Sequence, residues 1–201
     1  MKFVKIVSKD EFIATFLKSE IDSPRFGKRI LEKLVKDFQN RSIIDQPDFN
    51  LKKDCEYRRS LLKSLRGYPN REIFENFPTD IKWYRAILTK RELRKAKYIN
   101  YDYWIELSGG TRLPRDAAKN IENGLEIFKQ SNDNFWKAAE VFKNGTQFPE
   151  LIFVAENEKA DPIILEGHLR MTAMMLEESS IPNEIEVIMG LSENLSQWAL
   201  F

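Results

Sequence analysis

Three short segments in the last third of the chain limit its possible folds most strongly. Residues 151–155, LIFVA, and residues 162–165, PIIL, are almost entirely apolar, whereas residues 184–190, EIEVIMG, alternate between polar and apolar side chains. These lengths and patterns are typical of strands. A well-formed helix is expected before them, over 132–145, and a methionine-rich helix between the last two, over 168–179. The predicted order is therefore helix, strand, strand, helix, strand.

The first half of the chain is expected to be mainly helical. Ser8 and Glu11 have the spacing of a capping box, which marks the start of a helix. Two further helices are predicted over 79–88, TDIKWYRAIL, and over 89–99, TKRELRKAKYI. A short strand over residues 3–7 is the exception in this part of the chain.

Together these patterns predict an α+β fold with two parts. A mostly helical N-terminal region, residues 1–99, packs on a small mixed-sheet domain, residues 100–201. No linker rich in proline, glycine or serine marks the boundary near residue 100. We therefore expect the two parts to lie against each other.

The composition argues against several classes of protein. The chain has 32 basic and 31 acidic residues, so its net charge of +1 provides no general attraction to nucleic acid or anionic membranes. Cys55 is the only cysteine and His168 the only histidine, which disfavours a disulfide framework and a histidine-rich metal site. No apolar run approaches the roughly 20 residues that span a bilayer. We expect a cytoplasmic protein without a membrane partner and without a protein-built metal site.

The sequence EGHLR, which begins at Glu166, is the strongest candidate for a functional site. It joins an expected strand to an expected helix, and the first N–H groups of a helix lack intrahelical partners and attract anions. Gly167 allows a ligand to approach the backbone closely, and His168 and Arg170 add side-chain donors. The alternative is purely structural, with His168 capping the helix and Arg170 pairing with Glu166 or Glu177.

The order of elements around this turn, with three of its residues, is similar to that of a known family. A helix and a strand precede a second strand led by Pro162, and the glycine turn, an alanine-bearing helix and a closing strand follow. Gly167 matches the turn glycine, Arg170 the arginine three residues later, and Ala173 the alanine three beyond that. In these features the chain from about residue 110 to 190 resembles the ParB/sulfiredoxin-like superfamily.

This resemblance implies that the protein binds a nucleoside triphosphate together with Mg²⁺. The phosphates would be held by a glycine, a histidine and three arginines, namely Gly167, His168, Arg170, Arg112 and Arg115. Arginine suits this role because its planar fork can donate two hydrogen bonds to one phosphate. Glu166 adjoins the turn and is the candidate catalytic residue. If the protein is an enzyme, nucleotide hydrolysis or phosphotransfer is the expected reaction class.

Departures from the family pattern keep two other functions open. His168 stands where sulfiredoxins have a reactive cysteine, and Leu169 replaces the second basic residue of partition-type ParB proteins. The turn is closer to the Asp-Gly-His-His-Arg of ParB-fold free serine kinases, with Glu166 in place of the aspartate. The first alternative is a non-catalytic module that keeps the fold and binds a protein partner. The second is a ParB-like protein that binds DNA or RNA.

A basic segment over residues 85–97 is the reason for considering nucleic acid. In a helix, Arg91, Arg94 and Lys95 would share one face. Such a face is ordinarily solvated, but it could also neutralise backbone phosphates.

Overall fold

The computed structural model describes all 201 residues, 1–201, as nine α-helices, three short 3₁₀-helices and five strands. The strands are β1 (Lys2–Val7), β2 (Lys82–Thr89), β3 (Ile152–Ala155), β4 (Ile163–Glu166) and β5 (Glu184–Leu191). The helices are α1 (Lys9–Glu20), α2 (Gly27–Lys36), α3 (Ser42–Asp45), α4 (Lys52–Arg66), α5 (Lys90–Leu93), α6 (Asp102–Leu107), α7 (Pro114–Glu122), α8 (Asp133–Lys143) and α9 (His168–Leu176). The 3₁₀-helices are η1 (Glu72–Phe74), η2 (Glu178–Ser180) and η3 (Leu195–Gln197). None of the helices has the length and apolar content that crossing a membrane requires.

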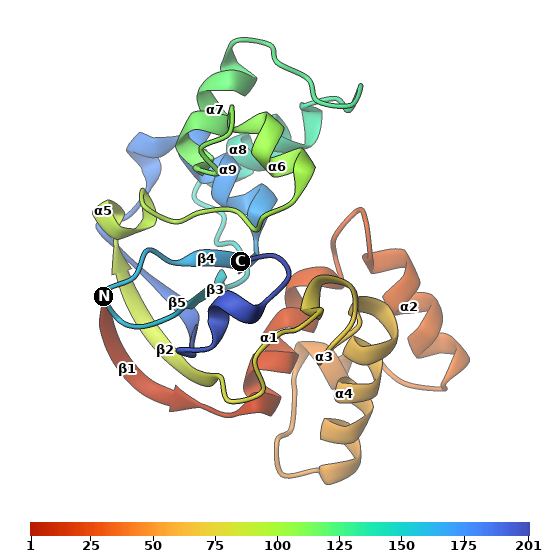
Figure 1. The fold of residues 1–201 in the computed structure, drawn as a ribbon. Coiled ribbons are helices and arrows are strands. Elements are labelled where there is room, and N and C mark those ends of the chain that lie inside the picture. The colour runs from red at the N-terminus through yellow and green to blue at the C-terminus, as the bar shows by residue number, and fades with distance from the viewer.

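All five strands form one mixed sheet in the order β1-β2-β5-β3-β4 (Figure 1). β2 is antiparallel to both β1 and β5, β3 runs parallel to β5, and β4 closes the far edge antiparallel to β3. The predicted α+β class, with a mixed sheet, is confirmed. The helix, strand, strand, helix, strand order of the last third is also confirmed.

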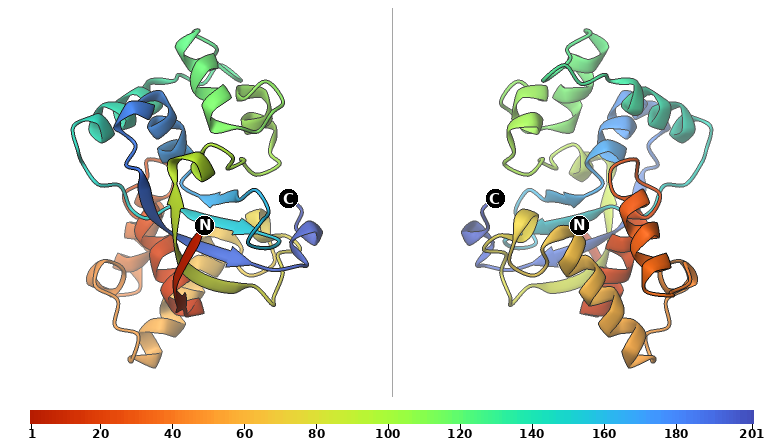
Figure 2. Two further views of the ribbon diagram at one scale, coloured as in Figure 1. Left: turned by 90° about the vertical axis from the view of Figure 1, so that its left-hand side faces the viewer. Right: turned by 90° about the vertical axis from the view of Figure 1, so that its right-hand side faces the viewer.

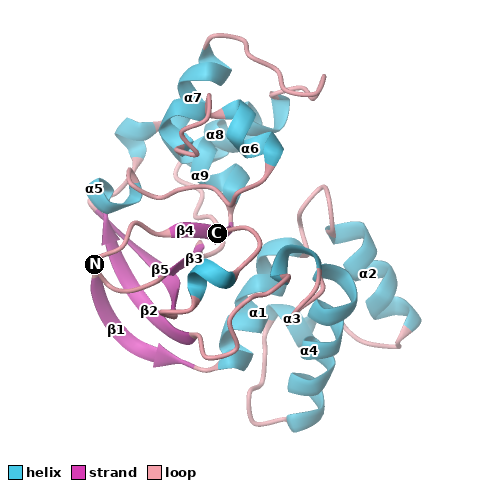
Figure 3. Cartoon of the chain, in the orientation of Figure 1, coloured by secondary structure: helices cyan, strands magenta, loops and turns pink.

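The sheet lies between two groups of helices, one formed by α1–α4 and the other by α6–α9 (Figures 1–3). Side chains of β3 alternate between them. Ile152 and Val154 belong to the core shared with α1–α4, and Phe153 and Ala155 belong to the core shared with α7–α9. Because both faces of β3 are covered, every side chain of this strand is apolar, which explains the unbroken LIFVA pattern.

The predicted helix over 79–88 is wrong, because residues Lys82–Thr89 form strand β2. The strand pairs with β5 along its whole length and with β1 on its other side. Its aromatic and β-branched residues favour a strand, and ladder partners on both sides stabilise that state over a helix. The periodicity of a short apolar run cannot make this distinction.

The predicted helix over 89–99 is confirmed only for one turn. Thr89 and Glu92 form a capping box, but α5 ends at Leu93. Beyond it the backbone turns to the edge of β4, where the Lys97 amide donates to the Pro162 carbonyl at 2.8 Å. The Lys97 carbonyl accepts from the Ile164 amide at 2.8 Å, so this segment covers an otherwise open sheet edge.

The predicted boundary near residue 100 runs through the sheet. β1 and β2 precede it, and they form one sheet with β5, β3 and β4, which follow it. The N-terminal region therefore contributes two strands to the sheet, in addition to the helices α1–α4.

Candidate functional site

Strand β4 ends at Glu166 and helix α9 begins at His168, so Gly167 alone makes the turn between them. Its backbone is left-handed, with φ of 105°. A Cβ at this position would lie 2.4 Å from the side chain of Leu151. Both the dihedral angle and the packing thus require glycine here, and α9 has no side-chain cap on its free N–H groups.

Arg170 and Glu166 form a nearly buried ion pair beside this turn. The Arg170 Nη2–Glu166 Oε1 distance is 3.2 Å, and the two side chains are 11% and 13% exposed. Nη1 of Arg170 donates to the Pro149 carbonyl at 2.6 Å. Nη2 is buried and, beyond its charge contact with Glu166, has no hydrogen-bond partner of acceptable geometry. The pairing proposed as a structural alternative is therefore present, and it leaves one guanidinium nitrogen unsatisfied.

Two residues of the N-terminal helices extend this charge cluster. Glu20, the last residue of α1, accepts from Arg66, the last residue of α4, at 2.7 Å between Oε1 and Nη1. The two side chains are 7% and 12% exposed. The charge of Glu166 acts on both residues, so the pair lies electrostatically close to the turn. We define the turn cluster as Glu20, Arg66, Glu166, His168 and Arg170.

Sequence reasoning missed Glu20 and Arg66, although each continues the apolar stripe of its helix. Glu20 stands four residues after the buried Phe16, and Arg66 stands four residues after the buried Leu62. Residues four apart share a helix face. A charged residue at the end of a buried apolar stripe was the one indication in the sequence. It did not reveal that Glu20 and Arg66 pair with each other, because they lie on different helices.

Burial sets the protonation of the turn cluster. It raises the pKa of Glu20 to about 7, and the charge of Glu166 adds to this increase against the opposing effect of Arg66. It lowers the pKa of His168 to about 3, and the positive charges of Arg66 and Arg170 lower it further. At neutral pH the imidazole of His168 is therefore uncharged.

His168 is held by aromatic stacking. Its ring lies nearly parallel to those of Trp104 and Tyr98, at centroid distances of 5.1 and 6.1 Å. The Tyr98 hydroxyl is hydrogen-bonded to Thr172 at 2.6 Å, which links the stack to α9. Nε2 of His168 is buried and has no hydrogen-bond partner. Buried polar atoms usually have a partner in the protein or an ordered water, so Nε2 is open to a hydrogen-bond partner from outside the chain.

The two other arginines expected at the ligand are not found beside the turn. Arg112 donates to the carbonyls of Tyr98 and Phe201 at 2.9 and 3.2 Å, and it lines a cavity with Lys97 and Ile163, at the opposite end of β4. These bonds use Nε and Nη1, and Nη2 of Arg112 is buried without a hydrogen-bond partner.

Arg115 lies near the start of α7, half-exposed, 3.8 Å from Asp116. Its charge acts on Glu178, which follows the C-terminal end of α9, whereas the turn adjoins the N-terminal end. We expected Arg112 and Arg115 to face the turn across a cleft. Their spacing in the sequence cannot establish that arrangement.

No group of three or more histidine, cysteine, aspartate or glutamate side chains is arranged to hold a metal ion. Magnesium is commonly bound by one or two carboxylates together with the phosphates of a ligand. Glu166 and Glu20 are the carboxylates of the turn cluster that could act in this way.

The basic segment over 85–97 does not form one helical face. Arg85 lies on β2 and pairs with Glu150 and Glu186, and Arg94 pairs with Glu178. The predicted common face of Arg91, Arg94 and Lys95 assumed a helix that in fact ends at Leu93. The ion pairs neutralise two of the charges that a nucleic-acid site would use.

Comparisons with protein-family models, with curated proteins and with solved structures found no match to this chain.

Proposed function

We propose that the protein binds the phosphates of a nucleotide at the turn cluster, in the manner that its resemblance to the ParB/sulfiredoxin-like superfamily implies. One observation carries this proposal. Arg170 Nη2 and His168 Nε2 are both buried without hydrogen-bond partners beside the uncapped N-terminus of α9. Phosphate oxygens are acceptors that suit the guanidinium of Arg170 and the free N–H groups of the helix.

The charges of the cluster support an anionic ligand. Arg66 and Arg170 supply two positive charges, against Glu166 and a Glu20 whose pKa lies near 7. If a phosphate binds the guanidinium of Arg170, it replaces Glu166 in the ion pair. Glu166 then lies next to the ligand, where a carboxylate can bind Mg²⁺ or accept a proton. Hydrolysis or transfer of a phosphoryl group is the reaction that this arrangement would serve.

Isothermal titration calorimetry with ATP, CTP and GTP, with and without Mg²⁺, tests the proposal. Arg170→Lys keeps the charge but loses the planar fork, and we expect it to weaken binding by about tenfold to a hundredfold. Arg115→Lys is the matched control, since Arg115 lies at the other end of α9, and it should leave the affinity unchanged. If the wild-type protein binds none of the three nucleotides, the proposal is wrong.

Glu20→Gln separates anion binding from loss of structure. This change removes negative charge from the cluster, so the affinity for the nucleotide should rise, whereas Arg170→Lys lowers it. A purely structural cluster would give the same sign for both variants, because each breaks an ion pair that joins two elements. Affinity that falls in both variants would therefore count against a phosphate site.

A protein-interaction module is the second candidate, and one feature of α2 favours it. Leu31 and Val35, four residues apart on α2, are 38% and 75% exposed, and Phe38, two residues beyond the end of the helix, is 97% exposed. Contiguous exposed apolar side chains are typical of protein contacts. Association that is lost in Val35→Ser with Phe38→Ser, and is indifferent to Arg170→Lys, would support this function.

A further inference from the structure

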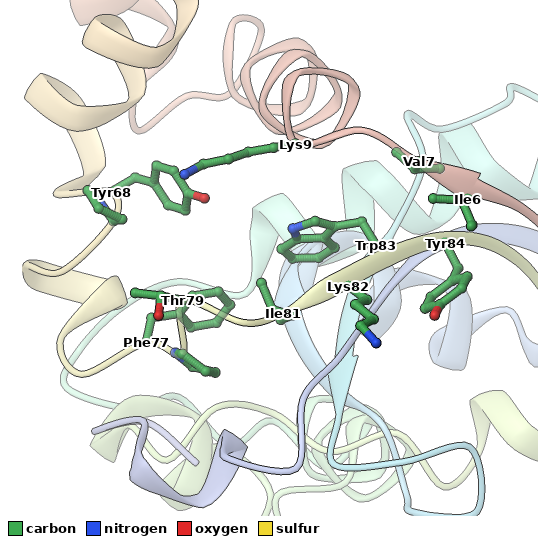
Figure 4. A pocket seen from close by; sticks show the side chains of 12 residues that line it. Ile6, Val7, Lys9, Tyr68, Phe77, Thr79, Ile81, Lys82, Trp83 and Tyr84 are labelled. Atoms are coloured by element: carbon green, nitrogen blue, oxygen red, sulfur yellow. The ribbon is translucent and has the colours of Figure 1, made fainter.

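A cavity of about 270 Å³ lies away from the turn cluster, between the end of β1, the start of β2 and the segment that follows α4 (Figure 4). None of its lining residues belongs to the turn cluster. Its walls are mainly aromatic and aliphatic, and they include Tyr68, Phe77, Ile81 and Trp83. An engineered cavity of roughly 150 Å³ accepts benzene, so this one has room for a single ring with a short side chain.

The side chains that line the cavity and carry hydrogen-bond donors include Lys9, Tyr68, Lys82 and Trp83. Figure 4 shows the ammonium of Lys9 against the ring of Tyr68, 5.1 Å from its centroid, with the Tyr68 hydroxyl facing Trp83. The indole nitrogen of Trp83 points toward Tyr68 (Figure 4). Lys82 lines the opposite end of the cavity, beside Tyr84.

These donors have no partner within the protein. The indole of Trp198 donates to the Ile73 carbonyl at 2.7 Å, but the indole of Trp83 makes no such bond. Tyr57 donates its hydroxyl to Asp37 at 2.9 Å, whereas the hydroxyl of Tyr68 makes no hydrogen bond within the protein. Lys9 lies over the ring of Tyr68 and forms no salt bridge with a carboxylate, whereas the charge of Lys82 acts on Asp80.

The cavity is rigidly built around Trp83. The ring of Trp83 stacks on that of Phe12, with 3.8 Å between the centroids and an angle of 8° between the planes. On the other side, a Cβ at Gly190 of β5 would lie 2.6 Å from this ring, so only glycine lets the indole lie flat against the sheet. The indole N–H is thus fixed in direction, which favours recognition of one acceptor position.

We propose that this cavity binds a small aromatic carboxylate, with its ring among Phe77, Ile81 and Trp83. The carboxylate accepts hydrogen bonds from the Trp83 indole and the Tyr68 hydroxyl, and Lys9 provides the opposite charge. Aromatic walls, convergent donors and an unpaired ammonium are the features that such a ligand requires.

Nuclear magnetic resonance of the full chain tests the proposal directly. The four indole N–H signals are followed while phenylacetate is added to about 10 mM, and Trp83→Phe identifies the signal of Trp83. We expect that signal to move downfield in a saturable manner, because its N–H gains a charged acceptor. Phenylacetamide, which has the same shape without the charge, should bind at least tenfold more weakly.

Variants that leave the core intact sharpen the test. Tyr68→Phe removes only a hydroxyl and should weaken phenylacetate binding about tenfold, and Lys9→Met about fivefold because Lys9 is exposed. Lys2→Met removes an exposed lysine outside the cavity and should have no effect. Equal binding of phenylacetate and phenylacetamide would overturn the proposal, as would a Trp83 signal that does not move. Binding only of a peptide that ends in phenylalanine would also overturn it.

Discussion

Two titratable groups of the turn cluster should give opposite pH dependences of stability, and single substitutions should reveal each one. The pKa of Glu20 is raised from 4.5 to about 7, so folding is favoured below pH 4.5 and loses this contribution as the pH rises through 7. The pKa of His168 is lowered from 6.5 to about 3, so its contribution is present above pH 6.5 and is lost as the pH falls toward 3.

Between pH 4.5 and 6.5 the two effects have opposite signs and similar size. Integrating each proton linkage over this window gives about 2 kcal/mol, with stability falling as pH rises for Glu20 and rising for His168. They nearly cancel in the wild-type protein. In Glu20→Gln, the free energy of unfolding should therefore rise by about 2 kcal/mol from pH 4.5 to 6.5 relative to wild type. In His168→Gln it should fall by about the same amount.

Urea unfolding followed by tryptophan fluorescence at pH 4.5, 5.5 and 6.5, at constant ionic strength, measures these slopes. A change in the free energy of unfolding that is the same at every pH, such as one from the loss of the Glu20–Arg66 pair, does not alter these slopes. Glu178→Gln is a suitable control, because Arg94 lowers the pKa of Glu178 and its transition lies below the window. If both cluster variants keep the wild-type slope, the assigned burial of these groups is wrong.

Three further substitutions probe the packing. Gly167→Ala places a Cβ 2.4 Å from Leu151 at a φ of 105°, and it should lower the free energy of unfolding by about 1–3 kcal/mol in chemical denaturation. Gly190→Ala places a Cβ 2.6 Å from the ring of Trp83, whose other face packs on Phe12, so we expect a loss of about 1–3 kcal/mol together with weaker phenylacetate binding because the indole must shift. Arg58 is fully buried and donates to two backbone carbonyls, so Arg58→Ala should cost about 3–5 kcal/mol, measured by thermal and urea unfolding.

Local patterns were sufficient for the last third of the fold but not for β2. The strands β3, β4 and β5 and the helices α8 and α9 follow from apolar runs, alternation and breaker residues in the sequence. Lys82–Thr89 has apolar residues compatible with either a helix or a strand, and its state is decided by β5, about 100 residues away. A reading of one segment at a time contains no information about that partner.

The turn cluster shows the same limit at the level of a site. Gly167, His168 and Arg170 could be selected because they are adjacent in sequence and stand between a strand and a helix. Glu20 and Arg66 join them only because α1 and α4 pack on the same face of the sheet. When side chains come together only through tertiary packing, the local sequence indicates this weakly at most, for example by a charged residue on an apolar helix face.

The central position of β5 has a consequence for how the chain folds during synthesis. β5 pairs with β2 on one side and β3 on the other, so it is the strand that joins β1 and β2 to the rest of the sheet. Until Glu184–Leu191 leave the ribosome, β2 and β3 each have an edge with unpaired backbone groups. Closing a sheet across about 100 residues is slow, and open edges favour association between chains. A translational pause before residue 184 would prolong this vulnerable state, whereas release of β5 completes both ladders in one step.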